Sequence, residues 1–370
     1  MRVASLFTLS AFVTALALAT IPVTIACSDG VSPPDSSNHQ IQLDNTYWTE
    51  LGLDGHWLSA ISETPWGLFA GTLGGGVFRL EPSDGKWVPL GLDHAQIGAI
   101  AFVPGSPDRL LVSVKPYADE QTDAAVFASE DGGATWAPSD DGLAVRNDRR
   151  FWSYSLAVAP TEPAKVFWGG NASILRSEDG GRHWSFVYGA EDWWGPGIGA
   201  MTVAPGGNGR VWAGGMTAIF LPTVIRMDAW GDTVQQLFIS PNNENSVYSL
   251  ALDPRNPDRL LAGMMGGVLY SDDDAETWNL SLVVDDLHGW VWTLAVQGNS
   301  VYAATMEDFS TAGDPLTTRL GLYVTGDSGE SWEAVPVPEG VAGAQSLLVH
   351  SDGRLLIGTA GSGLWSVEIR

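Results

Sequence analysis

The sequence predicts an all-β protein: a seven-bladed β-propeller with four-stranded antiparallel blades and a ring closed by an N-terminal strand. Three observations lead to this prediction. The 370 residues include 44 Gly, 21 Pro and 17 Trp, and 45% are hydrophobic, which is typical of a turn-rich chain with ample core. Short apolar runs bounded by Gly, Pro, Asp and Asn indicate many short strands. One cassette of such runs also recurs at the period of a propeller blade.

The cassette contains an apolar strand, a turn of Pro, Gly or Asp, a second strand ending in small residues, a third strand, and an acidic turn ending in Trp. Its clearest copy spans residues 250–278. The first strand recurs at residues 58–61, 100–104, 156–160, 201–205, 250–254, 294–296 and 347–349. Seven copies of four strands lie within the usual range for a closed propeller.

The acidic turns resemble the Asp-box, or BNR repeat, with its pattern S-x-D-x-G-x-x-W. Residues 129–136 and 177–184 match fully, residues 325–332 have Thr for Ser, and residues 271–278 have Ala for Gly. Residues 83–87 are a shortened relative, and the fourth copy offers only residues 228–232. The chain is therefore similar to the Asp-box seven-bladed propeller superfamily, which includes sialidase-like, sortilin-like and photosystem II assembly factor-like propellers.

We expect the recurring positions of these turns to serve the fold. Ser, Thr and Asp side chains can bond the turn's own amides, Gly permits positive φ, and Trp can bury against neighbouring strands. The residues in question are Ser129, Asp131, Gly133, Trp136, Ser177, Asp179, Gly181, Trp184, Ser271, Asp273, Trp278, Thr325, Asp327, Gly329 and Trp332.

Closure of the ring is predicted from a partial repeat near the N-terminus. Residues 48–54 repeat the pattern of residues 87–93, the outer strand of the first full copy, whereas the last copy ends one strand short at residues 363–369. The N-terminal copy can supply the missing strand and remove an open sheet edge.

Residues 1–26 are predicted to be a signal peptide, because one charge, Arg2, precedes an apolar stretch and a small residue, Ala26. Residues 24–27 resemble the lipobox of bacterial lipoproteins, although Thr24 stands where Leu or Val is usual. This implies lipidation of Cys27, the one cysteine; the alternative is an ordinary signal peptide with an incidental thiol. Residues 27–46 are polar and predict a tether, and residues 47–370 form the propeller. The chain is thus expected to be exported, to a bacterial cell envelope or beyond.

The formal net charge of −25 repels phosphate backbones and excludes nucleic acid as an expected partner. Contact with a membrane is expected only through a lipid anchor. The dispersed acids suit solubility, with attraction of cations or cationic partners as the alternative. No cofactor and no metal site are predicted, since the loop histidines are expected to be solvated, and the protein is expected to be monomeric.

Ligand binding is expected on the face opposite the acidic turns, as the resemblance implies, in loops that the repeat does not explain. Their mixed aromatic and charged content suits a sugar or a peptide. The candidate ligand-binding residues are Tyr117, Arg149, Arg150, Trp193, Trp194, His288, Trp290 and Arg319. Trp290 and Trp292 have packing between blades as their alternative role, and Arg149 and Arg150 have neutralisation of nearby aspartates.

The resemblance leaves two functions open. One is a non-catalytic binding or assembly module for a protein or glycan partner, which we favour. The other is a glycoside hydrolase, for which Glu191, Asp192, Asp286 and Asp308 are the speculative carboxylates. The sialidase arginine-Ile/Leu-Pro motif is absent near the first copy. The arginine found there, Arg79, stands in a third-strand context.

Overall fold

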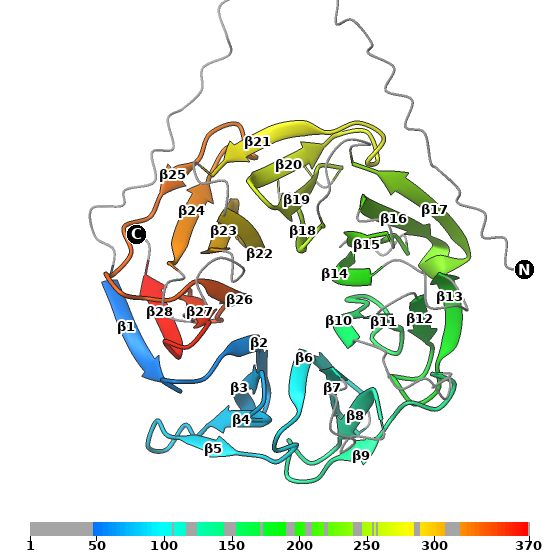
Figure 1. Cartoon of the computed structure of the whole chain (residues 1–370). Coiled ribbons are helices and arrows are strands. Elements are labelled where there is room, and N and C mark those ends of the chain that lie inside the picture. The colour runs from blue at the N-terminus through cyan, green and yellow to red at the C-terminus, as the bar shows by residue number, and fades with distance from the viewer. Residues whose placement is uncertain are drawn as a thin grey trace, which may run out of the picture. The chain divides into compact units, whose positions relative to one another are not determined.

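A computed structural model describes residues 47–105, 107–115, 124–143, 153–170, 173–189, 197–203, 209–217, 221–239, 246–253, 255–256, 258–284, 289–307 and 319–368. Within these ranges the chain is all-β, with seven four-stranded antiparallel sheets and one 3₁₀ turn at Ala229–Gly231. The sheets are arranged as the blades of a ring (Figure 1). The predicted signal peptide, Cys27 and the tether lie outside the described residues.

Blades 1 to 4 follow one another along the chain. Blade 1 contains β2 (Leu58–Thr64), β3 (Gly67–Thr72), β4 (Val77–Leu80) and β5 (Trp87–Pro89). Blade 2 contains β6 (Gln96–Val103), β7 (Arg109–Lys115), β8 (Val126–Ser129) and β9 (Ala137–Pro138). Blade 3 contains β10 (Ser153–Val158), β11 (Val166–Gly170), β12 (Ser173–Ser177) and β13 (Ser185–Gly189). Blade 4 contains β14 (Gly197–Val203), β15 (Val211–Met216), β16 (Pro222–Asp228) and β17 (Thr233–Phe238).

Blade 7 differs from the others because its outermost strand comes from the N-terminus. Blade 5 contains β18 (Ser249–Leu252), β19 (Leu260–Met264), β20 (Gly267–Ser271) and β21 (Asn279–Val283). Blade 6 contains β22 (Gly289–Gln297), β23 (Ser300–Glu307), β24 (Gly321–Thr325) and β25 (Glu333–Ala334). Blade 7 contains β26 (Ala344–Val349), β27 (Leu355–Thr359), β28 (Leu364–Glu368) and β1 (Tyr47–Gly52), which pairs antiparallel with β28.

The blades run from an inner strand near the axis to an outer strand on the wall (Figure 1). The four strands of a blade alternate in direction. The start of the inner strand and the turn between the second and third strands therefore lie at the same end of the ring. We call this end the entry face. The acidic turns join the third and fourth strands and lie at the opposite end, which we call the turn face.

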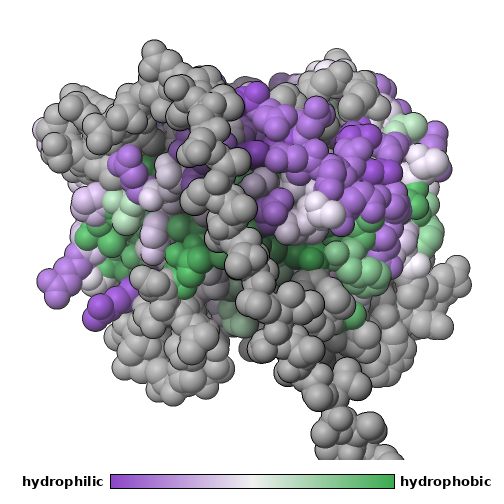
Figure 2. Space-filling model, turned by 90° about the horizontal axis from the view of Figure 1, so that it is seen from above, coloured by the Kyte–Doolittle hydropathy of each residue, from purple (hydrophilic) through white to green (hydrophobic). Residues whose placement is uncertain are grey.

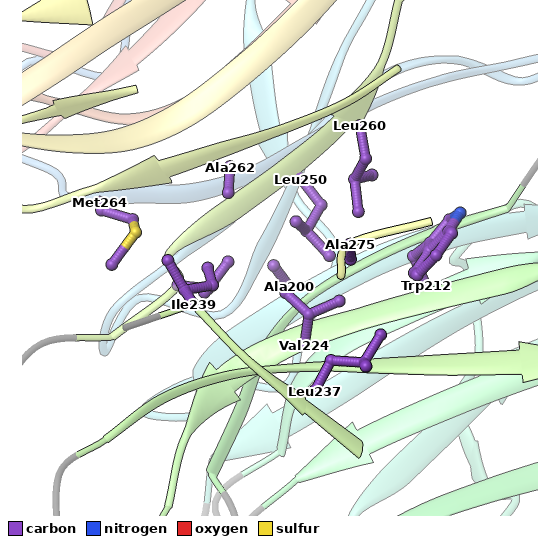
Figure 3. Packing of buried hydrophobic residues seen from close by; sticks show 11 residues of the cluster. Ala200, Trp212, Val224, Leu237, Ile239, Leu250, Leu260, Ala262, Met264 and Ala275 are labelled. Atoms are coloured by element: carbon purple, nitrogen blue, oxygen red, sulfur yellow. The ribbon is translucent and has the colours of Figure 1, made fainter. Parts of the chain in front are cut away.

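The core lies between blades rather than in one centre. Every residue of second strands β11, β19 and β27 is buried, because these strands are covered on both faces by neighbouring sheets. Figure 3 shows one such layer, in which Trp212 and Val224 of blade 4 pack against Leu250 and Leu260 of blade 5. Blade faces are thus buried pairwise around the ring.

Adjacent blades are matched in side-chain size at one position of each interface. A Cβ added to Gly71 of β3 would lie 2.4 Å from Cγ2 of Ile97, on the inner strand of the next blade. Gly169, Gly214, Gly263 and Gly358 likewise face Ile198, Val247, Val291 and Leu58. The two equivalent positions that are not Gly, Ser113 and Ala304, precede blades that carry the small residues Ser153 and Ala344. A large inner-strand residue therefore always coincides with a glycine.

The acidic turns are held by hydrogen bonds within the turn. In the turn of blade 2, the Ser129 hydroxyl donates to Asp131 at 2.7 Å and accepts from the Gly133 amide at 2.7 Å. Asp131 accepts from the amide and hydroxyl of Thr135, at 2.8 and 2.7 Å. Hydrogen bonds of the same kind occur at Ser177 and Asp179, at Ser271 and Asp273, and at Thr325 and Asp327.

Two consecutive residues of each of these turns have positive φ, not one. Gly132 and Gly133 occupy them in blade 2, with φ of 69° and 87°. Blade 5 places Asp274 and Ala275 there, with φ of 60° and 66°, so the turn geometry persists without glycine. Ala275 is 1% exposed and belongs to the layer between blades 4 and 5, which supplies packing that offsets the strained conformation.

Arginines link each of blades 1 to 5 to the next turn. Arg109 of blade 2, only 6% exposed, donates to the carbonyl of Gly180 at 2.6 Å and to the Ser139 hydroxyl at 2.9 Å. The same type of contact joins Arg79 to Gly132, Arg176 to Trp230, Arg210 to Asp274 and Arg259 to Ser328. These long side chains bury charge against carbonyl and carboxylate oxygens, and they tie successive blades together on the turn face.

Tryptophans make a reciprocal link in the opposite direction. The indole Nε1 of Trp136 donates to the carbonyl of Leu90 in the preceding blade at 2.8 Å, and Trp184 donates to Ser139 at 2.8 Å. Trp332 reaches Ser281 of blade 5 at 2.9 Å, whereas Trp278 donates within its own turn. The tryptophans that end the acidic turns thus serve three of the blade junctions.

Candidate functional site

Three aromatic rings stack where the inner strands of blades 5 and 6 begin. The ring centroid of Tyr248 lies 5.3 Å from that of Trp290 and 4.9 Å from that of Trp292, with interplanar angles of 9° and 19°. The two indoles are 6.0 Å apart and inclined by 11°. The three rings are thus nearly parallel, and Tyr248 stacks on both indoles. We call these residues the aromatic stack.

Irregular strand pairing positions two members of this stack. The register of β22 with β23 shifts between Val291 and Thr293, so Trp292 is an extra residue in the ladder. The amide of Tyr248 donates to the Gly263 carbonyl at 2.9 Å while Ser249 also pairs with Gly263, which makes Tyr248 the equivalent extra residue of blade 5. Such a bulge re-aims the side chain that it carries.

The same bulge occurs in every inner strand. Each blade therefore contributes one extra residue, and these residues surround the axis near the entry face. The remaining bulge residues are Ser59, Gly98, Tyr154, Gly199 and Gln345. Blades 1, 2 and 4 thus contribute Ser or Gly, whereas the adjacent blades 5 and 6 contribute Tyr248 and Trp292. Blade 3 contributes a third aromatic residue, Tyr154, but only blades 5 and 6 are an adjacent pair that both contribute one.

Buried apolar residues pack against the aromatic stack. Trp292 contacts a small buried cluster of Met306, Ala342 and Ala360. Gln345, 8% exposed, donates from Nε2 to the Met306 sulfur at 2.9 Å. The Nε1 of Trp290 is buried and makes no hydrogen bond with any residue that the structure describes. Trp292 thus packs against buried residues, while all three members of the stack remain partly accessible.

Among the predicted ligand-binding residues, the structure describes Trp290 and Arg319. Trp290 is half-buried within the stack, and Arg319 is exposed. The other ligand-binding candidates, Tyr117, Arg149, Arg150, Trp193, Trp194 and His288, lie outside the described residues. So do the four carboxylates considered for hydrolysis, Glu191, Asp192, Asp286 and Asp308.

Sequence reasoning missed Tyr248, the residue that covers both indoles. A signal was present, because Tyr248 stands two residues before Leu250 in the clearest copy of the cassette, just as Trp292 stands two residues before Leu294. Aligning the copies at this position would have paired the two aromatic residues. Trp57, which packs against the same buried cluster as Trp292, was likewise not singled out.

Two titratable side chains of the acidic turns, Asp131 and His183, have shifted pKa values. Hydrogen bonds from the side chain and amide of Thr135 and from Ser129 lower the pKa of Asp131 to about 2. His183 has a raised pKa, chiefly through its hydrogen bond with Asp179. Across the described ranges, no three His, Cys, Asp or Glu side chains form a group that could hold a metal ion, and no helix is long and apolar enough to cross a membrane.

Comparison with known sequences finds partial similarity to xyloglucanases and no match to any family model. The chain is 31% identical over 159 residues to the oligoxyloglucan-reducing end-specific xyloglucanase of Emericella nidulans. The matched segment covers 40% of this chain and 20% of that protein. It is 29% identical over 133 residues to a xyloglucanase of a Paenibacillus species, covering 32% of this chain and 13% of that protein. The chain thus spans a fifth or less of the length of these relatives.

Solved structures share the fold. An ancestral GH74 enzyme matches 71% of this chain and 35% of its own, with a TM-score of 0.55 and 20% identity. YCF48 from Cyanidioschyzon merolae matches 86% of this chain and 98% of its own, with a TM-score of 0.60 and 15% identity. At such identities the likeness concerns the fold. The protein is a seven-bladed β-propeller of the kind found in these proteins, with partial sequence similarity to glycoside hydrolases.

Proposed function

We propose that the propeller binds a β-linked glycan on its entry face, with the aromatic stack as the main contact. The observation that carries this proposal is the stacking of Tyr248 with Trp290 and Trp292, which gathers three partly accessible rings where two neighbouring inner strands begin. Sugar rings present C–H groups on their faces and hydroxyls at their edges, so an aromatic surface can contact the face without desolvating the hydroxyls.

The partial similarity to xyloglucanases supports a glucan as the ligand. Xyloglucan, named in the relatives, is a neutral β-linked polysaccharide, and a neutral ligand is compatible with a protein of net charge −25. A protein partner, also considered from the sequence, would be expected to present cationic groups instead. We therefore favour the glycan.

Titration calorimetry with xyloglucan oligosaccharides of one and two repeating units tests the proposal. We expect both to bind the wild type, and Tyr248→Ala to weaken binding of the one-unit oligosaccharide about tenfold or more, because a stacking anchor is lost. The matched control is Phe186→Ala, since Phe186 is an aromatic residue 56% exposed on outer strand β13. Unchanged affinity in Tyr248→Ala, or an equal loss in the control, would contradict the proposal.

Hydrolysis of the same glycan is a second candidate, favoured by the similarity to xyloglucanases. It requires two carboxylates on either side of the scissile bond, about 5 Å apart for retention and 6.5–9.5 Å apart for inversion. Asp192 and Asp286 are the first to test. Release of reducing ends by the wild type and its loss in Asp192→Asn or Asp286→Asn would establish an enzyme. Binding without release of reducing ends would support a binding module.

We further propose that the four acidic turns are Asp-boxes and that the protein is exported and anchored at the cell envelope through Cys27. The hydrogen-bonded Ser or Thr and Asp pairs support the first point. The apolar N-terminus and the position of Cys27 in the sequence support the second. Mass spectrometry of the mature N-terminus tests the anchor, because Cys27→Ser would abolish a diacylglycerol adduct.

A further inference from the structure

We infer that the bound glycan runs outward from the aromatic stack across the entry-face edge of blade 5 to the outer wall. The site would then accept an extended neutral chain rather than a single terminal sugar. This inference rests on the proposed function and adds the direction in which the ligand lies.

Strand pairing defines a row of residues along this edge. Ser249 pairs with Gly263 on β19. The next residue of β19, Met264, pairs with Gly267 on β20, and Gly267 pairs with Val283 on β21. The row therefore begins beside Tyr248 and ends at the last residue of the outer strand. With strands about 4.8 Å apart, three steps across the blade span roughly 14 Å, which is long enough for several sugar rings.

The surface of this row is apolar and open. Met265 is 41% exposed and Val283 is 59% exposed, and Met265 is bridged to Trp290 of the stack by backbone pairing. Between them lies Gly266, where an added Cβ would meet nothing within 4 Å. Figure 2 shows hydrophobic residues within the wall of the ring on the side that includes β21. The stack and the wall are thus joined by exposed apolar side chains with a flat turn between them.

Hydrogen bonds fix this turn relative to the stack. The amide of Gly266 donates to the carbonyl of Gly289, next to Trp290, at 2.8 Å. Its carbonyl accepts from the amide of Val284, next to Val283, at 3.0 Å. Both ends of the row are therefore tied to one residue, and a ligand would meet a preformed surface at a small entropic cost.

The chemistry of the row selects the class of chain. The side chains of Tyr248, Met265 and Val283 are uncharged, and the protein around them is strongly acidic. A β-linked neutral glycan is flat and presents apolar ring faces, so it complements this row, whereas a polymer of uronic acids would be repelled.

The test compares ligand lengths. In titration calorimetry, the double variant Met265→Ser/Val283→Ser is expected to bind the two-unit oligosaccharide about fivefold more weakly while its affinity for the one-unit oligosaccharide stays unchanged. Both residues are exposed, so the fold should persist. The matched control is Leu280→Ser, because Leu280 is 61% exposed on the same strand but lies near its turn-face end.

The possible outcomes separate the two proposals. A length-independent loss, no loss, or an equal loss in Leu280→Ser would overturn the radial path while leaving the stack as the binding site. Failure of the wild type to bind either oligosaccharide would overturn both. A polygalacturonate chain bound as tightly as the neutral two-unit oligosaccharide would contradict the selection for neutral glycans.

Discussion

The indole Nε1 of Trp48 on β1 donates to the carbonyl of Pro336, next to the outer strand of blade 6, at 2.9 Å. Trp136 makes the same contact with Leu90 in blade 1, and Trp87 makes it with Leu51 at 2.7 Å. The N-terminal strand therefore brings with it a tryptophan that contacts the preceding blade, as the tryptophans at the ends of acidic turns do elsewhere.

Trp48→Ala is expected to lower the free energy of unfolding by about 1–3 kcal/mol, less than for a fully buried Trp because this side chain is half-buried. It loses the bond to Pro336 and the edge contact with Trp365, 6.4 Å away. Urea denaturation measures the effect. Tyr47→Ala is the control, since Tyr47 is 58% exposed on the same strand; equal losses in both variants would show that Trp48 has no special role.

Arg109→Met is expected to cost about 2–4 kcal/mol of stability, because it leaves the Gly180 carbonyl and the Ser139 hydroxyl without a buried donor. Arg182→Met is the matched control: the Arg182 side chain is 43% exposed and pairs with Glu130 at the same junction. We expect the control to change stability by less than about 1 kcal/mol. Similar urea midpoints for the two variants would rule out the buried link as the source of stability.

Gly71→Ala is expected to destabilise the protein by about 1–3 kcal/mol through overpacking against Ile97. The change should be absorbed when Ile97 is shortened, so Gly71→Ala/Ile97→Ala should be no less stable than Ile97→Ala alone. A double-mutant cycle of unfolding free energies measures this coupling. Additive losses would mean that the two residues do not compete for the same space.

Acid should weaken the turn of blade 2 through Asp131. Its pKa falls from 3.8 to about 2 through hydrogen bonds from Thr135 and Ser129. Because the folded pKa lies below the unfolded one, this carboxylate adds stability that is fully present above about pH 4 and is lost as pH falls toward 2.

Asp131→Asn should therefore be less stable than the wild type at pH 6, and the difference should shrink as pH falls from about 4 to 2. Urea denaturation across this range measures it. Thr135→Val, which removes the hydroxyl donor but keeps the carboxylate, should show a smaller effect of the same sign. A pH-independent difference for Asp131→Asn would show that ionisation of Asp131 does not contribute.

The blades could be predicted from sequence because their signals are local. Strand alternation and the Ser, Asp, Gly and Trp of each acidic turn lie within a few residues of one another. The arginine contacts were not predicted, since Arg109 and Gly180 are 71 residues apart. Arg109 also begins a second strand whereas Arg176 lies in a third strand, so the contact has no fixed position in the repeat.

The aromatic stack was only half predicted for a related reason. Trp290 and Trp292 were visible as aromatic residues at a strand start, but a bulge shifts pairing by one residue and leaves no periodic trace. Tyr248 was therefore not singled out. That it covers two rings of the next blade depends on the twist between blades, which only the folded structure provides.

The pairing of each large inner-strand residue with a glycine has a consequence for assembly. Ile97 fits against Gly71 but would collide with the side chain of Ser113 or Ala304, so neighbouring blades are not interchangeable. Misassembled rings, in which a blade is skipped or exchanged between two molecules, would bring mismatched sizes together. The contacts between blades thus restrict which blades can follow blades 2 and 6, independently of the order in which the chain connects them.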